Sequence, residues 1–203
     1  MHNKKAKIQQ LFRESIAVKN QIINLSIFDS LVLMANQITQ AIQNGNKIML
    51  CGNGGSAADA QHLAAEMLVR LRPRNNREGI AAIALAQDIS TITACGNDFG
   101  FERLYERVIR SLGNEGDILI AITTSGNSEN VILAMKSAKE MGIGVFGLLG
   151  CDGGKALELC DESFVVPSYD TGRIQESHIT AGHALMECIE DSLLESGYLH
   201  LEN

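Results

Sequence analysis

Residues 47–56 read KIMLCGNGGS, a short apolar run that ends in a glycine-rich turn. The strand-like part of this stretch covers residues 47–51. Four similar runs follow it along the chain, at residues 80–85, 117–123, 144–149 and 163–166. Each is apolar almost throughout, whereas a strand with one solvent-facing side would alternate. Continuous apolar strands are typical of a parallel sheet that is covered on both faces, so the sequence predicts five parallel strands.

The segments between these runs have the apolar spacing of helices. They cover residues 57–69, 101–111, 127–141 and 174–194. Residues 1–45 also show helical spacing without strand-like alternation, so two further helices are expected there. Alternating strands and helices predict an open, doubly wound α/β sheet with helices on both faces. The chain fits a single domain, 1–203, made of the N-terminal helical segment 1–45 and an α/β core over 46–203.

The composition is that of an ordinary globular chain, with 45% apolar and 20% charged residues. A net charge of -7 argues against nucleic acid as a partner, because binding to its phosphates needs clustered Lys and Arg. No apolar run approaches the roughly 18–20 residues of a membrane span, and no signal-peptide stretch follows the polar N-terminus. We therefore expect a cytoplasmic protein without a membrane partner. The five cysteines form no CxxC pair, which indicates free thiols.

The turn at residues 52–56, GNGGS, stands between the first strand and the next helix. Glycine lets the backbone approach a ligand closely, and Ser56 can cap the helix and offer a hydroxyl group. The free N–H groups of a helix start attract anions. The turn is no Walker A loop, since no Gly-Lys-Ser/Thr follows, and it lacks the pattern of a dinucleotide site. The alternative is a plain strand-to-helix turn.

A second polar loop, TTSGNS at residues 123–128, follows the third strand and precedes another helix. Its four hydroxyl groups suit an anion with many acceptor oxygens, although the same residues could simply cap the helix. Ligands of open parallel sheets bind outside the carboxyl ends of the strands, and both loops lie at that edge. Since there is no P-loop lysine, the two loops predict a phosphomonoester rather than a nucleoside triphosphate.

Two helices carry residues suited to acid–base or metal chemistry. His62 and Glu66 are four residues apart, which places them on one face of the helix after the first loop, although a surface pair has the same spacing. Gln175 and His183 are eight residues apart in the last helix, about 80° around its axis, and can share a broad face. His178 competes for the same role, and packing alone could explain this helix.

Two more polar segments have two interpretations each. Residues 95–101, CGNDFGF, have the composition of a turn between helical segments. Asn97 and Asp98 there could hydrogen-bond sugar hydroxyl groups or merely cap a helix. Residues 70–78, RLRPRNNRE, form a polar, basic loop. We expect this loop to be the most mobile part of the chain, either as a solvated linker or facing the substrate.

Taken in chain order, these motifs resemble those of one family. They are CGNGGS, His62 with Glu66, GNDFGF, TSGNS, DGGK at 152–155, and RIQESH with His183. From about residue 1 to residue 196 they are similar to the sedoheptulose 7-phosphate isomerases, or phosphoheptose isomerases, of the sugar isomerase (SIS) fold.

The resemblance implies a fold, a reaction and an assembly. The fold is a SIS-type doubly wound sheet. The reaction is conversion of sedoheptulose 7-phosphate to D-glycero-D-manno-heptose 7-phosphate, the first step toward ADP-heptose and the heptose of the lipopolysaccharide core. The assembly is a homotetramer, in which the helices of residues 1–45 serve oligomerisation and the sites lie at subunit interfaces.

The resemblance also implies roles for individual residues. One zinc ion per subunit would be bound by His62, Glu66, Gln175 and His183. Phosphate would be held by Ser56, Thr123, Thr124, Ser125 and Ser128. The sugar would contact Asn53, Gly54, Gly55, Asn97 and Asp98, together with Glu66 and Gln175. Isomerisation through a cis-enediol needs a base near carbon and an acid near oxygen, so Glu66 is the predicted base and His183 the group that moves the oxygen-bound proton.

Some members of this family carry an acid directly before the Arg of RIQ, where this chain has Gly172; Asp170 lies two residues earlier. One rival interpretation is a non-catalytic SIS-fold protein that associates with the bacterial replication initiator. Such proteins tend to lack the equivalents of Glu66, of the TSGNS serines and of His183, all of which are present here. The other rival, a phosphosugar sensor within a regulator, is disfavoured because the sequence has no DNA-binding module or basic patch.

Overall fold

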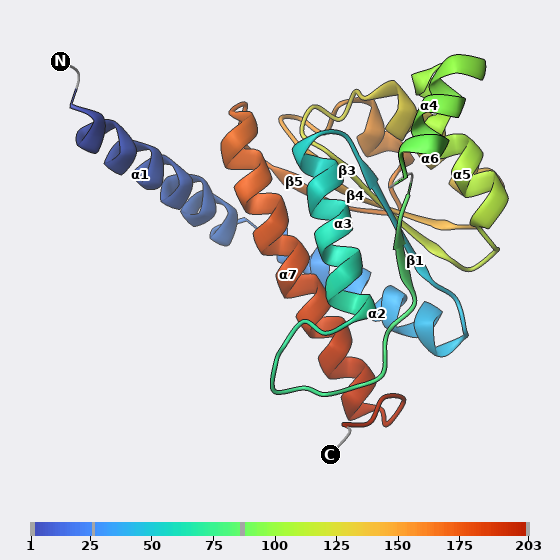
Figure 1. Ribbon diagram of the computed structural model, residues 1–203. Coiled ribbons are helices and arrows are strands. Elements are labelled where there is room, and N and C mark those ends of the chain that lie inside the picture. Colours follow the sequence, from blue (N-terminus) through green and yellow to red (C-terminus); the bar gives the residue numbers. More distant parts are fainter. Residues whose placement is uncertain (1–2, 26, 86–87, 202–203) are drawn as a thin grey trace.

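Five parallel strands form one sheet in the order β2-β1-β3-β4-β5 in the computed structural model, which describes residues 3–25, 27–85 and 88–201 (Figure 1). The strands are β1 (Ile48–Gly52), β2 (Ala82–Ala84), β3 (Ile118–Thr123), β4 (Gly144–Gly150) and β5 (Glu162–Val166). Every residue of β1 and β3 is buried, as expected for strands covered on both faces. The predicted five-stranded parallel sheet is confirmed.

Helices cover both faces of this sheet. They are α1 (Lys4–Ile23), α2 (Phe28–Gln43), α3 (Gly55–Leu68), α4 (Ile89–Asp98), α5 (Leu104–Leu112), α6 (Glu129–Glu140) and α7 (Thr171–Glu195), with 3-10 helices η1 (Phe101–Arg103) and η2 (Gly154–Leu159). Leu119 and Ile120 are neighbours on β3 and point to opposite faces, so they belong to two separate cores. Figure 1 shows α3 and α7 on one side of the strands and α4, α5 and α6 on the other.

The main element that the sequence missed is α4. Residues 95–98, expected to be a turn, form its last turn, and the helix ends at Asp98. Asp88 caps the start, because its Oδ1 accepts a hydrogen bond from the backbone N–H of Thr91 at 2.7 Å. The run ISTITACGND is poor in strong helix formers, so this Asp cap was the best local signal for the helix.

The other boundaries shift by a few residues. The strand predicted over residues 80–85 is the three-residue edge strand β2, and the helix predicted over 101–111 begins as η1. α7 begins at Thr171, three residues earlier than predicted. Asp170 caps it by accepting a hydrogen bond from the N–H of Arg173 at 3.1 Å. This acid therefore stabilises the helix start.

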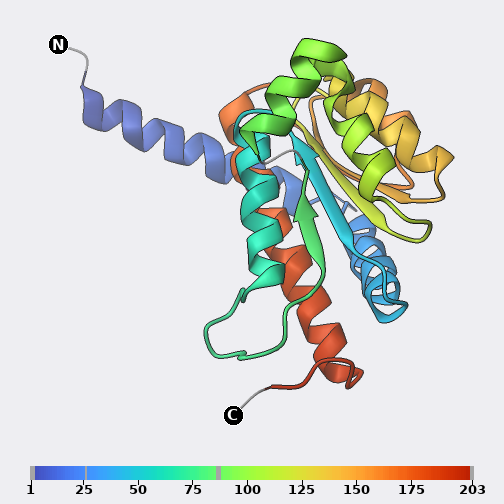
Figure 2. The ribbon, with the colours of Figure 1, turned by 45° about the vertical axis from the view of Figure 1, so that its right-hand side comes forward.

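The two N-terminal helices differ in how they pack. α2 buries seven residues against α7 and β5, whereas α1 projects away from the sheet (Figures 1 and 2). On α1, Phe12 is 70% and Ile16 56% exposed. No single helix in the described part is long and apolar enough to cross a membrane; α1 and α2 meet that test by length and composition only as a pair bent by 77°. Apolar side chains of α1 are thus left uncovered by the described part of the chain.

His178, the sequence-based rival of His183, lies in the core. Its side chain on α7 is fully buried, and its Nε2 lies 2.8 Å from the backbone oxygen of Leu149 on β4. Because a carbonyl only accepts, Nε2 carries the hydrogen, and Nδ1 is buried without a hydrogen-bond partner among the described residues. Burial lowers the pKa of His178 to about 4. This histidine is therefore a neutral core residue.

This buried histidine predicts a loss of stability at acidic pH. An unfolded histidine titrates near pH 6.5 and the folded His178 near 4, so the unfolded state binds more protons between these values. We expect its contribution to the free energy of unfolding to be constant above pH 6.5 and to fall by ~1.4 kcal/mol per pH unit toward pH 4. Urea titrations measure this slope.

The matched variants for this titration are His178→Gln, which keeps a donor for the Leu149 carbonyl, and His200→Gln, which alters an exposed histidine. The slope should flatten in the first variant and persist in the second. An unchanged slope in His178→Gln would assign the acid sensitivity to other groups.

Candidate active site

Three side chains from two helices converge where α3 meets α7. His62 and Glu66 lie one turn apart on α3 and face His183 on α7. The Nε2 atoms of His62 and His183 are 2.8 Å apart, and His62 Nε2 lies 3.5 Å from Glu66 Oε1. One potential ligand atom from each of the three residues lies within 4.8 Å of the others. The structure thus brings together three of the residues that the sequence proposed for chemistry.

The donor set of this group fits a divalent metal ion. Two imidazoles and a carboxylate are ligands that zinc accepts. Two imidazole Nε2 atoms only 2.8 Å apart need a proton or a cation between them, since two bare lone pairs repel each other. The side chain of His62 is 47% exposed, which leaves the group accessible from solvent. The residues present are therefore compatible with the predicted zinc site.

Asp59, which the sequence analysis did not single out, adds negative charge beside this group. It precedes His62 by three residues and Glu66 by seven, so all three share one face of α3. Its Oδ2 atom is buried and has no hydrogen-bond partner in the described part of the chain. Burial raises the pKa of Asp59, and the electrostatic effect of the neighbouring His62 and His183 opposes that rise. The i, i+3, i+7 spacing was the sequence signal that could have revealed Asp59.

Glycines let α3 and α7 approach each other closely. A Cβ atom on Gly182 of α7 would lie 2.6 Å from Leu63 Cδ1 on α3. A Cβ atom on Gly55 would lie 2.4 Å from Nε2 of Gln175. Gln175, the fourth predicted zinc ligand, therefore lies directly against the first residue of α3. A side chain at Gly182 would press on Leu63, and one at Gly55 would displace the flexible end of the Gln175 side chain.

The two predicted anion loops lie side by side at the carboxyl edge of the sheet. β1 and β3 are paired with Gly52 opposite Ile122, so the loops that follow them are neighbours. The side-chain amides of Asn53 in the first loop and Asn130 at the start of α6 exchange two hydrogen bonds of 2.8 Å. The Thr123 hydroxyl lies 3.2 Å from that of Ser128. The prediction that both loops lie at one edge is confirmed.

The starts of α3 and α6 lack side-chain caps. Gly54, with a φ of 55°, is the N-cap of α3, so Ser56 does not cap the helix as the sequence suggested; Ser56 is instead its buried second residue. Ser128 is the N-cap of α6, but its side chain makes no capping hydrogen bond and contacts Thr123 instead. Helix starts of this kind leave backbone N–H groups available to an anion.

A third loop packs against the TTSGNS loop of residues 123–128. Residues 151–155 follow β4, and the backbone N–H of Lys155 donates to Asn127 Oδ1 at 3.2 Å. Gly126 has a φ of 64°, and a Cβ atom there would lie 1.9 Å from the backbone oxygen of Gly153. Only glycine fits at this contact, because the obstacle is backbone. The DGGK motif thus fixes the shape of the TSGNS loop.

Comparison with known proteins identifies the family. Residues 11–150 match the SIS domain family. The phosphoheptose isomerase of Aquifex aeolicus (strain VF5) is 47% identical over 189 residues, which cover 93% of this chain and 97% of that protein. This chain belongs to the phosphoheptose isomerase family. The structure of phosphoheptose isomerase GmhA from Neisseria gonorrhoeae has a TM-score of 0.87 at 42% identity, covering 93% of this chain and 100% of that one. The structure of a phosphoheptose isomerase from Francisella tularensis has a TM-score of 0.88 at 35% identity, covering 93% of this chain and 99% of that one.

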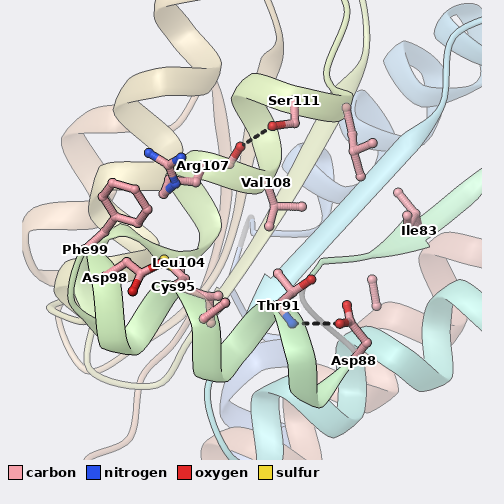
Figure 3. A pocket seen from close by; sticks show the side chains of 13 residues that line it. Ile83, Asp88, Thr91, Cys95, Asp98, Phe99, Leu104, Arg107, Val108 and Ser111 are labelled. Carbon is pink, nitrogen blue, oxygen red and sulfur yellow. Dashed lines mark hydrogen bonds between the residues drawn. The ribbon is translucent and has the colours of Figure 1, made fainter.

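In this member of the phosphoheptose isomerase family, Asn97 and Asp98 are the last two residues of α4. Their exposed side chains hydrogen-bond each other at 2.7 Å. Asp98 lines a groove of about 720 Å³ between β2, α4 and α5 (Figure 3). The groove is mostly apolar, and the guanidinium of Arg107 lies 3.6 Å above the ring of Phe99 beside it. It contains none of the other predicted site residues, so its size alone does not mark the active site.

The basic loop at residues 70–78 does not fit the first of its two interpretations, a solvated linker. Arg77 is buried, and both Arg72 and Arg77 donate to the carboxylate of Glu190 on α7. A solvated linker would leave these charges exposed. The prediction missed the contact because the partner lies 113 residues further along the chain.

Proposed function

We propose that this chain converts sedoheptulose 7-phosphate to D-glycero-D-manno-heptose 7-phosphate, an aldose–ketose isomerisation at the first step toward ADP-heptose and the heptose of the lipopolysaccharide core. The observation that carries the proposal is the convergence of His62, Glu66 and His183 on helices next to two anion loops. The relatives that the chain matches along most of its length are named phosphoheptose isomerases. Its five free cysteines support a location in the reducing cytoplasm.

The substrate phosphate is held at the carboxyl edge of the sheet. Hydroxyl groups from both loops would bind it: Ser56, Thr123, Thr124, Ser125 and Ser128. The backbone N–H groups at the starts of α3 and α6 add hydrogen bonds and the positive ends of two helix dipoles. Asn53, Gly54, Gly55, Asn97, Asp98 and Gln175 are the proposed contacts to the sugar. Anchoring the phosphate this way fixes the reacting carbons relative to α3.

Glu66 is the proposed base. Its carboxylate removes the proton from the carbon beside the carbonyl, which gives a cis-enediol, and returns the proton to the neighbouring carbon. His183 moves the other proton between the two oxygens, so atoms and charge balance over the cycle. The Glu66 side chain is 19% exposed, which leaves a carboxylate oxygen free to reach a substrate.

His62, Glu66, Gln175 and His183 would hold one zinc ion per subunit. When bound, zinc polarises the substrate carbonyl and stabilises negative charge on the enediolate oxygens. The convergence of three of these side chains and the buried, unpartnered oxygen of Asp59 support this assignment.

Homotetramer formation, with the sites at the interfaces, is also proposed. On α1, Ile8, Phe12 and Ile16 are more than half exposed, at 56%, 70% and 56%. A groove of about 410 Å³ runs between α2 and α7, and another of about 470 Å³ on α7 includes His183. Further copies of the chain that cover these apolar surfaces would also enclose the open side of the His183 group.

The alternative is a non-catalytic SIS-fold protein that associates with the replication initiator. The same fold would serve it, but such a protein has no need of an accessible base next to two histidines. The His62–Glu66–His183 group therefore favours the enzyme.

The test is an isomerase assay with sedoheptulose 7-phosphate and purified protein, with and without added zinc, with the product followed by NMR. We expect turnover to D-glycero-D-manno-heptose 7-phosphate, and light scattering should give the mass of a tetramer. A wild-type protein that is inactive under both conditions would reject the enzyme and leave the alternative.

A further inference from the structure

The segment that follows α3 holds the C-terminal end of this helix. Glu66 lies in the last turn of α3, where carbonyl groups lack partners within the helix. Arg77 donates to two of them, from Nη2 to the oxygen of Glu66 at 3.1 Å and from Nη1 to the oxygen of Met67 at 3.0 Å. The N–H of Ile80 adds a hydrogen bond of 2.9 Å to Met67. Arg77 thus supplies hydrogen-bond donors to the backbone carbonyls in the helical turn that carries Glu66.

Arg77 is itself held by α7. Its Nε donates to Glu190 Oε1 at 2.6 Å, and both side chains are 0% exposed. Glu190 follows His183 by seven residues, or about two helical turns, so the two side chains share a face of α7. Figures 1 and 2 show the segment leaving the end of α3 and lying beside α7 before it returns to β2. A second link between α3 and α7 therefore lies about two helical turns along α7 from the His62–His183 contact.

Other polar groups complete the surroundings of Glu190. Its Oε2 accepts hydrogen bonds from Arg72 Nε at 2.5 Å and from Asn75 Nδ2 at 2.9 Å. Burial would raise the pKa of this carboxyl, but the hydrogen bonds from Arg77, Asn75 and Arg72 hold it below its ordinary value. Glu190 therefore carries a charge that Arg77 and Arg72 compensate.

The two arginines differ in what else they contact. Among the described side-chain hydrogen bonds and ion pairs, those of the Arg72 guanidinium go to α7 alone, to Glu187, Glu190 and Asp191. Arg77 instead joins α7 to the last turn of α3. Arg72 and Arg77 therefore share one buried carboxylate, and among their described contacts it is Arg77 that hydrogen-bonds the backbone of Glu66.

We propose that Arg77, anchored by Glu190, positions Glu66 against His62 and His183. The inference rests on the proposed function, because Glu66 is the proposed base. A helix end whose carbonyls lose their partners opens locally, and Glu66 would then move relative to α7. A displacement of about 1 Å at a reacting group can cost about 10²-fold in rate. Arg77 and Glu190 are positioning residues and touch no substrate.

The test compares Arg77→Lys with Arg72→Lys, a matched control on the same carboxylate. Lysine keeps the positive charge beside Glu190 but cannot reproduce the donor geometry of the guanidinium. For Arg77→Lys we expect kcat to fall about 10- to 100-fold with KM unchanged, since the phosphate loops are untouched. Zinc affinity of the metal-free protein, titrated with zinc alone, should weaken about 10- to 100-fold. Amide hydrogen exchange over residues 63–69 should speed up.

Arg72→Lys should leave kcat, zinc affinity and this exchange unchanged, even where it lowers the melting temperature. Equal effects of the two variants, confined to melting temperature, would overturn the proposal and make Arg77 a purely structural residue. If Arg77→Lys does not fold, Glu190→Gln takes its place, with the same changes expected in kcat and exchange. If wild type is inactive, the proposed function fails, but zinc affinity and exchange still decide whether Arg77 holds the Glu66 turn.

Discussion

Glu66→Gln is expected to lower kcat for sedoheptulose 7-phosphate by about 10²–10⁴-fold, the range that a positioned general base contributes. Glutamine keeps the size of the side chain and can still contact His62, but its amide cannot take a proton from carbon. The side chain is 19% exposed at the α3–α7 contact, so the substitution should leave the fold intact. A coupled assay for the aldose product measures kcat and KM together.

The control is Glu158→Gln, the same chemical change on an exposed residue of η2 that is not a proposed site residue. Zinc content must be measured alongside, because Glu66 is also a proposed ligand. Loss of turnover with zinc retained would assign the carboxylate to proton transfer, whereas loss of both would assign it first to the metal. Full activity of Glu66→Gln would remove this residue from the mechanism.

Removal of the metal should have the second largest effect. We expect a chelator to reduce turnover by about 10²-fold or more, since a bound zinc ion supplies several kcal/mol of stabilisation to developing charge. Activity should return with zinc and not with magnesium, which prefers a shell of oxygen ligands over imidazole. Zinc at 100 times its Kd should also stabilise the folded chain by about 2.7 kcal/mol, measured as a rise in melting temperature.

His183→Gln separates this effect from any action of the chelator elsewhere. It removes one of two imidazoles whose Nε2 atoms lie 2.8 Å apart, so zinc should no longer raise the melting temperature. The metal site would be ruled out if protein purified from zinc-replete medium contained no zinc and chelators did not change its activity. The phosphate loops would then carry the reaction together with Glu66 and His183 alone.

Local patterns in the sequence were enough to predict the sheet and its loops. Residues 118–122 of β3, for example, are all apolar and all buried, and such a run leaves few folds other than a covered parallel sheet. Strand-to-helix turns rich in glycine and hydroxyl groups must then gather at the carboxyl edge. The helical repeat alone was also enough to predict that His62 and Glu66 lie close together on one face of α3. These features depend on neighbours within a few residues.

Three-dimensional packing was needed to distinguish the two histidines of α7 and to find the partners of the buried charges. His178 and His183 are both on α7, and the packing of this helix turns one toward Leu149 and the other toward His62. The same packing buries Arg77 against Glu190, in a loop whose composition predicts exposure. Local sequence cannot specify the His62–His183 and Arg77–Glu190 contacts, because their partners lie more than 100 residues apart in the chain and meet only when α3 and α7 dock.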